Sequence, residues 1–472
     1  MTHGCLPKEI AEYPDIDYTT VSTIIRGSTD KTNISRPDLH TMTPSKHPNR
    51  IPSLVFANSA GEITDYPELE MAGRSGSHFS RPSLEDLIPL PEGSDIFVLP
   101  GRLPVGIDPE TGEPLLVEEN PLEPAAGLQA VAAFMSPAHT AIHWAAFEKS
   151  NADLAHLPLF AYTAVGWHDG QFWVSGFRSD PDKRQEMNRF QPEKLTRRTE
   201  QWLRQYEQNR LIQHLGKCCL TYRCPAAINY FLRQFEAPLP TSPVCNAQCL
   251  GCISLQPSGC CPSTQDRINF VPTPKEIAEI AVPHLTAVKG GVASFGQGCE
   301  GEPLLQADTI EKAILLIRKE TEQGTINLNS NASLPEAVDR LAHAGLDSLR
   351  VSMNSAQSIY HQRYYRPKGF TFDSVKQSIR VMKQHGRFVS LNYFILPGFT
   401  DDPAEFAALC ELIGEYHPDF LQLRNLNMDP DWYFDALKFE EGGAPMGIRA
   451  WLKQLKQRFP RLRFGYFNPP LR

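Results

Sequence analysis

Residues 242–254 read SPVCNAQCLGCIS and place three cysteines, Cys245, Cys249 and Cys252, within eight residues. Thiols clustered at such spacing indicate a metal site or catalysis more often than disulfides when the compartment is reducing. A structural zinc site usually has four ligands in two separated pairs. An iron–sulfur cluster held by only three cysteines instead keeps one iron with an open position, which a catalytic metal site needs. The spacing therefore leaves two readings open: a zinc or iron–sulfur module that builds structure or an interaction surface, and a catalytic cluster.

Composition sets the class of protein. The chain has 472 residues, 41% of them hydrophobic and 21% charged, with a net charge of -8. These values are typical of a globular protein, and they give no strong nucleic-acid signal. The N-terminus has no basic start followed by an apolar run, and no segment reaches the ~20 apolar residues of a membrane span. We therefore expect a cytoplasmic protein without a membrane partner.

After the cysteines the sequence alternates between short apolar runs and amphipathic segments of helical period. Expected strands are 290–296, 325–331, 347–355, 388–396, 419–427 and 462–467. Expected helices are 273–285, 309–323, 333–345, 372–386, 402–416 and 447–459, the first and third opening on capping boxes at Thr273–Glu276 and Ser333–Glu336. This order predicts parallel βαβ units, in an open doubly wound sheet or a complete or partial barrel. Functional groups then lie at the carboxyl ends of the strands.

The N-terminal half has a different texture. Residues 1–90 are rich in proline and are expected to form an extension, and residues 91–237 an α+β domain. Within that domain, 160–177 predicts a β-hairpin around Asp169-Gly170, and 197–216 predicts one amphipathic helix. Residues 238–440 are expected to form the core, and 441–472 a helix and strand that complete it.

The motif CNAQCLGC resembles the C-x3-C-x2-C signature of the radical S-adenosylmethionine (radical SAM) superfamily, and the likeness extends over residues ~240 to ~430. The resemblance implies an α/β fold with a partial (βα)6 TIM-like barrel. It implies that Cys245, Cys249 and Cys252 hold a [4Fe-4S] cluster whose fourth iron binds S-adenosylmethionine. An electron from the cluster would cleave that cofactor to a 5′-deoxyadenosyl radical, which abstracts hydrogen from a substrate.

The resemblance also assigns cofactor contacts, all at or near expected strand ends. Glu300-Gly301-Glu302-Pro303 is similar to the family's Gly-Gly-Glu-Pro motif, which meets the methionine amino group, with Glu300 in place of the first glycine. The cofactor-binding residues that the likeness implies are Gly301, Glu302, Ser330, Ser352 and Asn392. Many members carry an aromatic residue before the third cysteine, where this chain has Gly251.

Six further cysteines lie near the motif. An auxiliary iron–sulfur cluster could draw on Cys218, Cys219, Cys224, Cys260 and Cys261, although free cysteines also fill cores. Cys299, inside the Gly-Glu-Pro segment, could donate hydrogen to a substrate radical, and is otherwise a small buried residue.

The superfamily resemblance implies a reductant such as flavodoxin or ferredoxin. The sequence identifies neither the catalytic residues nor the substrate, which could be a peptide, an RNA or a small metabolite.

Overall fold

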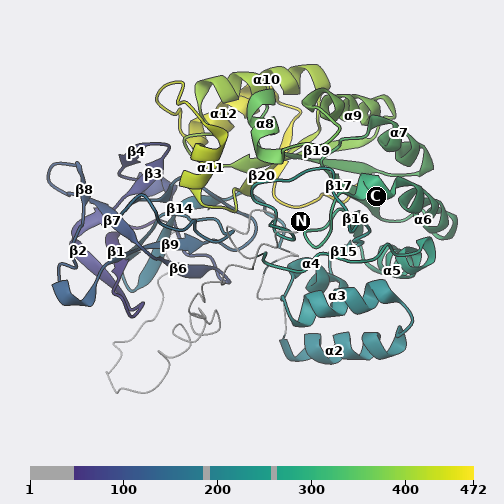
Figure 1. Cartoon of the computed structure of the whole chain (residues 1–472), viewed down its shortest axis with the longest axis horizontal. Coiled ribbons are helices and arrows are strands. Elements are labelled where there is room, and N and C mark those ends of the chain that lie inside the picture. The colour runs from purple at the N-terminus through teal and green to yellow at the C-terminus, as the bar shows by residue number, and fades with distance from the viewer. Residues whose placement is uncertain (1–46, 184–185, 187–191, 257–262) are drawn as a thin grey trace, which may run out of the picture.

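The computed structural model describes residues 47–183, 186, 192–256 and 263–472. An antiparallel β-structure formed by residues 53–178 lies beside a curved parallel sheet with its helices (Figure 1). In sequence, three further helices separate the antiparallel strands from the parallel ones. Within the described ranges, no helix is long and apolar enough to cross a membrane.

The N-terminal strands are short and mostly antiparallel. They are β1 (Ser53–Ala57), β2 (Ile63–Met71), β3 (Gly73–Ser75), β4 (His78–Ser80), β5 (Leu87–Pro89), β6 (Asp95–Leu99), β7 (Arg102–Ile107), β8 (Pro114–Leu116), β9 (Gln129–Phe134), β10 (His139–Ala141), β11 (Trp144–Ala145), β12 (Phe147–Lys149), β13 (Val165–His168) and β14 (Gln171–Arg178). The main path through the larger sheet is β10-β14-β13-β1-β2-β7-β12. The expected hairpin is β13–β14, whose turn residues Asp169 and Gly170 both have positive φ, as a tight hairpin turn requires.

The expected extension up to residue 90 is wrong for residues 53–89, because β1 pairs with β13 and β9 inside the sheet. Pro52 and Pro89 stand at strand borders, and Pro67 lies at the irregularity of β2 between Tyr66 and Glu70, where a missing N–H costs little. The remainder of that expectation, residues 1–46, lies outside the described residues.

Helices α2 (Pro192–Gln205), α3 (Arg210–Leu220) and α4 (Pro225–Phe231) follow the sheet. One helix was expected over 197–216, and two are found. The break occurs at Asn209, whose side chain accepts from the N–H of Ile212 and starts α3. Leu211, Leu215 and Phe231 pack into the core of the parallel sheet, so these helices adjoin the barrel rather than the strands before them.

The parallel sheet has seven strands in chain order: β15 (Glu236–Pro238), β16 (Val292–Phe295), β17 (Thr325–Ser330), β18 (Ser348–Met353), β19 (Phe388–Ile395), β20 (Phe420–Asn425) and β21 (Arg463–Gly465). Its helices are α5 (Pro274–Ala287), α6 (Ala307–Glu320), α7 (Pro335–Ala344), α8 (Ser358–Tyr365), α9 (Phe372–Gln384), α10 (Pro403–Tyr416), α11 (Pro430–Leu437) and α12 (Ile448–Arg458). Helices line the outer side of the curved sheet (Figure 1). This is the partial TIM-like barrel that the family resemblance implies, one of the arrangements that the βα order left open.

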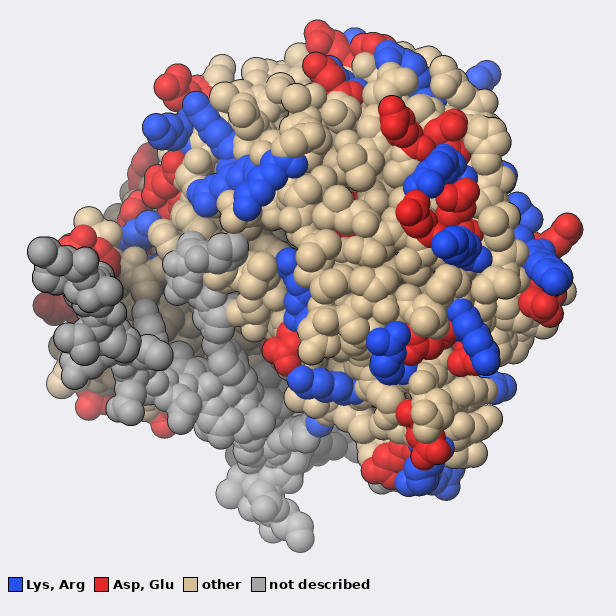
Figure 2. All heavy atoms as spheres, turned by 45° about the vertical axis from the view of Figure 1, so that its right-hand side comes forward, with Lys and Arg blue, Asp and Glu red and all other residues tan. Residues whose placement is uncertain are grey.

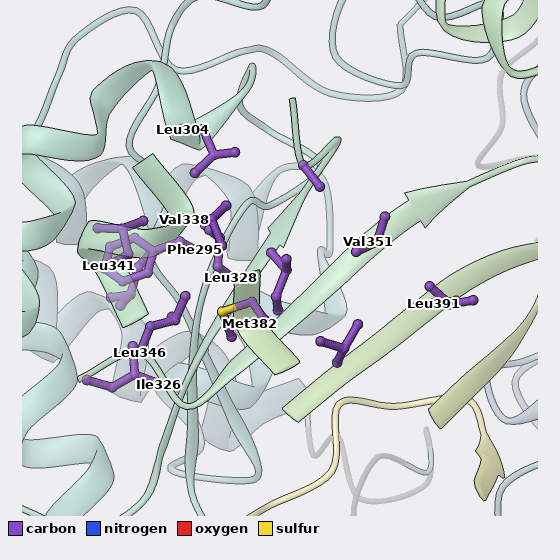
Figure 3. Close-up of a cluster of buried hydrophobic side chains, with 14 of the residues drawn as sticks. Phe295, Leu304, Ile326, Leu328, Val338, Leu341, Leu346, Val351, Met382 and Leu391 are labelled. Carbon is purple, nitrogen blue, oxygen red and sulfur yellow. The ribbon is translucent and has the colours of Figure 1, made fainter. Parts of the chain in front are cut away.

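The barrel core lies between the sheet and its outer helices. Figure 3 shows Phe295 and Leu328 of the strands beside Val338 and Leu341 of α7, with Val351 farther along the sheet. All five are fully buried. Burial on this scale, roughly 1.5–3 kcal/mol for each large apolar side chain, fixes the strands and thereby the positions of the residues at their ends.

The charged surface gives no single-sign face in the view of Figure 2, where acidic and basic side chains are interspersed. Pairs such as Arg340 with Asp308 and Glu311 account for part of this pattern.

Candidate functional site

A cavity of about 310 Å³ opens at the carboxyl ends of the parallel strands. The structure brings all eight residues singled out from the sequence to its wall: Cys245, Cys249, Cys252, Gly301, Glu302, Ser330, Ser352 and Asn392. They come from the loop after β15, the loop after β16, the ends of β17 and β18 and the middle of β19. The parallel topology gathers these ends at one edge of the sheet.

The cysteine loop is held by backbone bonds to the end of α8. The N–H of Leu250 donates to the carbonyl of Tyr364 at 3.0 Å, and that of Gln248 donates to Tyr365 at 2.9 Å. Burial chiefly raises the pKa of the Cys245 thiol to about 11 and holds the pKa of the Cys249 thiol well above its ordinary value. In this setting the protonated thiols are unreactive as nucleophiles, and a bound metal cation would favour their deprotonated, thiolate form.

Arg267 supplies positive charge to the loop. Its Nη2 lies 3.4 Å from the Sγ of Cys252, and its Nε donates to Ser254 Oγ at 3.1 Å. A cation against a ligand sulfur stabilises the thiolate and tunes a metal centre bound there. Sequence reasoning missed Arg267, which follows the cysteines by fifteen residues and carries no motif.

The segment Gly301-Glu302 runs against the cysteine loop. The N–H of Gly301 donates to the carbonyl of Ser242 at 2.7 Å, and the N–H of Glu302 donates to that of Val244 at 2.9 Å. A Cβ on Gly301 would lie 2.0 Å from the carbonyl oxygen of Val244. Glycine is therefore required here for the close approach of the two backbones.

Glu300, the departure from the family pattern, fastens the same two segments. Its carboxylate accepts from the N–H groups of Thr241 and Ser242, at 2.7 and 2.9 Å, and from Gln297 N at 2.7 Å. The side chain is buried. Through these bonds it stabilises the geometry of both loops, a role that the sequence did not indicate.

Glu302 points to the end of β17. Its carboxylate accepts from Ser330 Oγ at 2.6 Å and from the N–H groups of Asn331 and Leu304, at 2.9 and 3.0 Å. Burial raises the pKa of Glu302 to about 7. A positively charged group bound beside it would offset that desolvation and favour the carboxylate form.

Ser352 and Asn392 lie side by side on the cavity wall, because they are in register across the neighbouring strands β18 and β19. The Oδ1 atom of Asn392 is buried without a hydrogen-bond partner among the described residues. Such an orphaned acceptor fits a site that a polar ligand completes.

The wall beside Gly251 is aromatic although residue 251 is not. A Cβ on Gly251 would lie 3.0 Å from the hydroxyl oxygen of Tyr364, which is buried on α8. Tyr364, Tyr365 and Phe394 all line the cavity, and the rings of Tyr364 and Phe394 pack edge to face at 5.5 Å. These aromatic rings line the side of the cavity next to Gly251, where the cysteine motif itself has no aromatic residue.

The spacing of the three thiols bears on which metal group they fit. Among the described residues, sets of His, Cys, Asp or Glu whose ligand atoms all lie within 4.8 Å are His214–Cys218–Cys299 and Asp339–His343–His385, and the loop cysteines form no such set. Sulfur atoms on one zinc ion stand about 3.8 Å apart, given Zn–S bonds of about 2.3 Å. A donor set of three more widely spaced thiols therefore fits a multi-iron cluster better than a single ion.

The remaining cysteines are grouped differently from the auxiliary cluster expected from the sequence. Of the five proposed for an auxiliary cluster, Cys218 joins the compact set with His214 and Cys299, whereas Cys219 and Cys224 do not. Cys260 and Cys261 lie outside the described residues. Cys410 is buried in α10, in agreement with a core role.

Residues 239–410 match the family model described as "Radical SAM superfamily". A curated relative, the probable dual-specificity RNA methyltransferase RlmN of Synechococcus sp. (strain JA-2-3B'a(2-13)), is 27% identical over 161 residues, which are 33% of this chain and 45% of the relative. The FeMo cofactor biosynthesis protein NifB of Klebsiella pneumoniae is 25% identical over 177 residues, 34% of this chain and 37% of that protein. The chain thus spans less than half the length of these curated relatives.

Among solved structures, Streptococcus suis SuiB bound to precursor peptide SuiA matches with a TM-score of 0.34 and 14% identity, covering 55% of this chain and 53% of that one.

Proposed function

Because the chain belongs, through residues 239–410, to the radical SAM superfamily, we propose that it reductively cleaves S-adenosylmethionine and uses the 5′-deoxyadenosyl radical to abstract hydrogen from a substrate. The observation that carries the proposal is the convergence of Cys245, Cys249 and Cys252 with Glu302 on one cavity. In this proposal residues 238–440 are the catalytic core, and residues 441–472 complete it.

The three cysteines would hold a [4Fe-4S] cluster, which supplies the electron for the cleavage. Arg267, against the sulfur of Cys252, would keep that thiolate ionised and oriented. Glu302 would accept from the cofactor's amino group, with its carboxylate held in place by Ser330 Oγ.

The cofactor's ribose and adenine would lie along the strand ends that follow. Ser352 and Asn392 would bind its hydroxyl groups, since the Asn392 oxygen has no partner among the described residues. Tyr364 and Phe394 would exclude water from this side of the cavity.

The electron would come from a small redox protein such as flavodoxin or ferredoxin. A second iron–sulfur cluster that uses some of Cys218, Cys219, Cys224, Cys260 and Cys261 stays a prediction. The substrate could be a peptide, an RNA or a small metabolite, and the two curated relatives, whose names describe different activities, do not decide among these classes.

Anaerobic reconstitution with iron and sulfide tests the proposal. Dithionite and S-adenosylmethionine are then added, and 5′-deoxyadenosine is measured for the wild type and for the variant with Cys245, Cys249 and Cys252 changed to Ala. The matched control is Cys410→Ser, a buried cysteine far from the cavity in sequence. About four irons per chain and product in the wild type and control, with both lost in the triple variant, are expected.

Zinc in place of iron, together with no 5′-deoxyadenosine from the reconstituted wild type, would overturn the proposal. The three cysteines would then belong to a structural or interaction module.

A further inference from the structure

The cavity has a second group of polar side chains that the cofactor does not account for. Arg350 on β18 and Arg424 on β20 line its wall, and the Nε atom of each is buried without a hydrogen-bond partner among the described residues. The hydroxyl group of Tyr365, which also lines the cavity, is likewise buried without a hydrogen-bond partner among the described residues. Buried polar atoms are nearly always satisfied in folded proteins, so three unmatched donors in one cavity indicate a missing acceptor.

Neither arginine has an acidic partner within ion-pair distance in the described part of the chain. Arg350 Nη1 donates to Gln422 Oε1 at 3.4 Å, and the guanidinium of Arg424 lies over the ring of Tyr466, 4.4 Å from its centre. Burial, followed by the charge of Arg424, lowers the pKa of Arg350 to about 9. Two half-buried cations that repel each other are costly without an anion.

Glu236 is the nearby carboxylate, and it is already engaged. Asn468 Nδ2 donates to Glu236 Oε1 at 2.9 Å, and Asn468 Oδ1 accepts from Gln422 Nε2 at 3.0 Å. This network, which includes the C-terminal segment, forms the floor below the arginines. One carboxylate against two guanidinium groups leaves a net charge of about +1 at this end of the cavity.

The arginines occupy a different part of the cavity from the cysteine loop. Arg350 precedes Ser352 by two residues on the same face of β18, so its Cα lies about 7 Å deeper in the barrel. Tyr365, at the end of α8, also lines this cavity, and burial chiefly raises its pKa. Arg424 is in register with Phe394, two residues past the level of Asn392, so the two arginines flank the level of the proposed cofactor contacts from β18 and β20.

We propose that Arg350 and Arg424, with the hydroxyl group of Tyr365, bind an oxyanion of the substrate, a carboxylate or a phosphate group. The planar guanidinium groups match either oxyanion through paired N–H donors. The inference rests on the proposed function and gives its substrate a chemical class: an anionic molecule, or an anionic part of a larger one, anchored in the barrel. The anchor would hold the neighbouring carbon–hydrogen bond near the cofactor.

Anion binding is measured calorimetrically on the anaerobically reconstituted protein, with malonate and inorganic phosphate as probes. Binding of at least one probe is expected, weakened tenfold or more in Arg424→Met and in Arg350→Met. Arg340→Met, in a surface ion pair on α7, is the control and should bind as the wild type does. The tighter probe identifies the oxyanion class.

Methionine replaces most of the arginine volume without its charge, so Arg424→Met should fold and melt at the same or a higher temperature. S-adenosylmethionine binding and its cleavage without substrate should be unchanged in this variant. Equal binding of both probes by wild type and Arg424→Met would overturn the inference. A parallel loss of S-adenosylmethionine binding would also overturn it, because the pair would then serve the cofactor's own carboxylate. Probe binding does not require cofactor cleavage. The inference can therefore fail while the proposed function holds, and the proposed function can fail while the probes still bind.

A second, independent observation concerns His214, Cys218 and Cys299. His214 and Cys218 are one turn apart on α3, with Nε2 and Sγ 3.6 Å apart, and Cys299 comes from the loop after β16. The three ligand atoms lie within 4.8 Å of one another, and both cysteines are buried. Imidazole and thiolate at this spacing suit one tetrahedral ion.

We infer that these three residues bind a single zinc ion, which fastens α3 to the loop that carries Glu300. Metal is quantified in the variant that lacks Cys245, Cys249 and Cys252, so that the loop cysteines cannot contribute. One zinc per chain is expected, retained in Cys410→Ser and lost in Cys218→Ser or Cys299→Ser. Cobalt(II) should give the visible absorption of a thiolate-bound ion in the same variants. Absence of bound zinc, or its retention after both substitutions, would overturn this inference.

Discussion

The backbone N–H of Gly301 donates to the carbonyl of Ser242 across 2.7 Å, which joins the loop after β16 to the start of the cysteine loop. A methyl group at 301 would meet the Val244 carbonyl at 2.0 Å, and neither backbone can yield without moving Cys245. We predict that Gly301→Ala lowers the iron bound per chain by at least half and lowers the free energy of unfolding by about 1–3 kcal/mol. Iron analysis after reconstitution and urea unfolding of the apoprotein measure the two effects.

The matched control is Gly414→Ala in α10, where a Cβ would contact nothing within 4 Å. A helical glycine replaced by alanine should raise stability by up to about 1 kcal/mol and leave iron loading unchanged. Full iron loading of Gly301→Ala would contradict the steric argument.

Glu300 supports the same junction through its side chain. In Glu300→Gln one carboxylate oxygen becomes an amide nitrogen, so the N–H groups of Thr241 and Ser242, or that of Gln297, lose their acceptor. Leaving a buried donor unsatisfied costs about 1–3 kcal/mol. We predict a corresponding loss of stability in urea and slower cluster reconstitution, followed by absorbance. A variant that unfolds and loads iron as the wild type does would show that the carboxylate does not hold the two loops.

The βα order of the barrel could be predicted because buried parallel strands are apolar runs between helices with recognisable ends. The capping box at Thr273 is present, with the Thr273 hydroxyl and the Glu276 carboxylate both engaged. The expected box at Ser333 is not: α7 begins at Pro335, with Leu334 as its N-cap. The Ser333 hydroxyl instead accepts from Asn246 Nδ2 of the cysteine loop, a tertiary contact that local sequence cannot reveal.

The candidate site could be predicted only where a motif or a strand end marked it. Cys245, Gly301 and Ser352 fall in such places. Arg350 lies inside a strand, and its position on the cavity wall depends on which face of β18 turns inward. That information comes from barrel closure, not from the residues around it in sequence.

The N-terminal sheet is joined to the barrel by a buried ion pair. Arg102 Nη2 on β7 lies 3.3 Å from Asp429 Oδ2, which also accepts from Leu157 N at 2.9 Å. Asp429 Oδ1 accepts from the first N–H groups of α11. We predict that Asp429→Ala costs about 3–5 kcal/mol in guanidinium unfolding, because Arg102 is left buried without its partner.

Removing both charges tests the cause. The double variant Arg102→Met, Asp429→Ala should recover part of the lost stability, since no buried charge is left unpaired. A double variant that is less stable than Asp429→Ala would mean that Arg102 contributes through its contacts with backbone carbonyls and not through the pair.

Glu276 gives the apoprotein a stability that depends on pH. Hydrogen bonds from Arg210, with Nη2 2.8 Å from Oε2, chiefly lower the pKa of Glu276 to about 2, and Thr273 also donates to it. A carboxyl group whose folded pKa is below its unfolded value stabilises the fold above about pH 4.5, and this stabilisation is lost as the pH falls toward about 2. Since Arg210 is half exposed, solvent screening limits the contribution to about 1–2 kcal/mol. Urea unfolding of the apoprotein and of Glu276→Gln, from about pH 6 to about pH 3.5, should therefore give a stability gap that narrows on acidification. Glu336→Gln at the start of α7 is the control and should show no such trend, and a gap that widens at low pH would contradict the assignment.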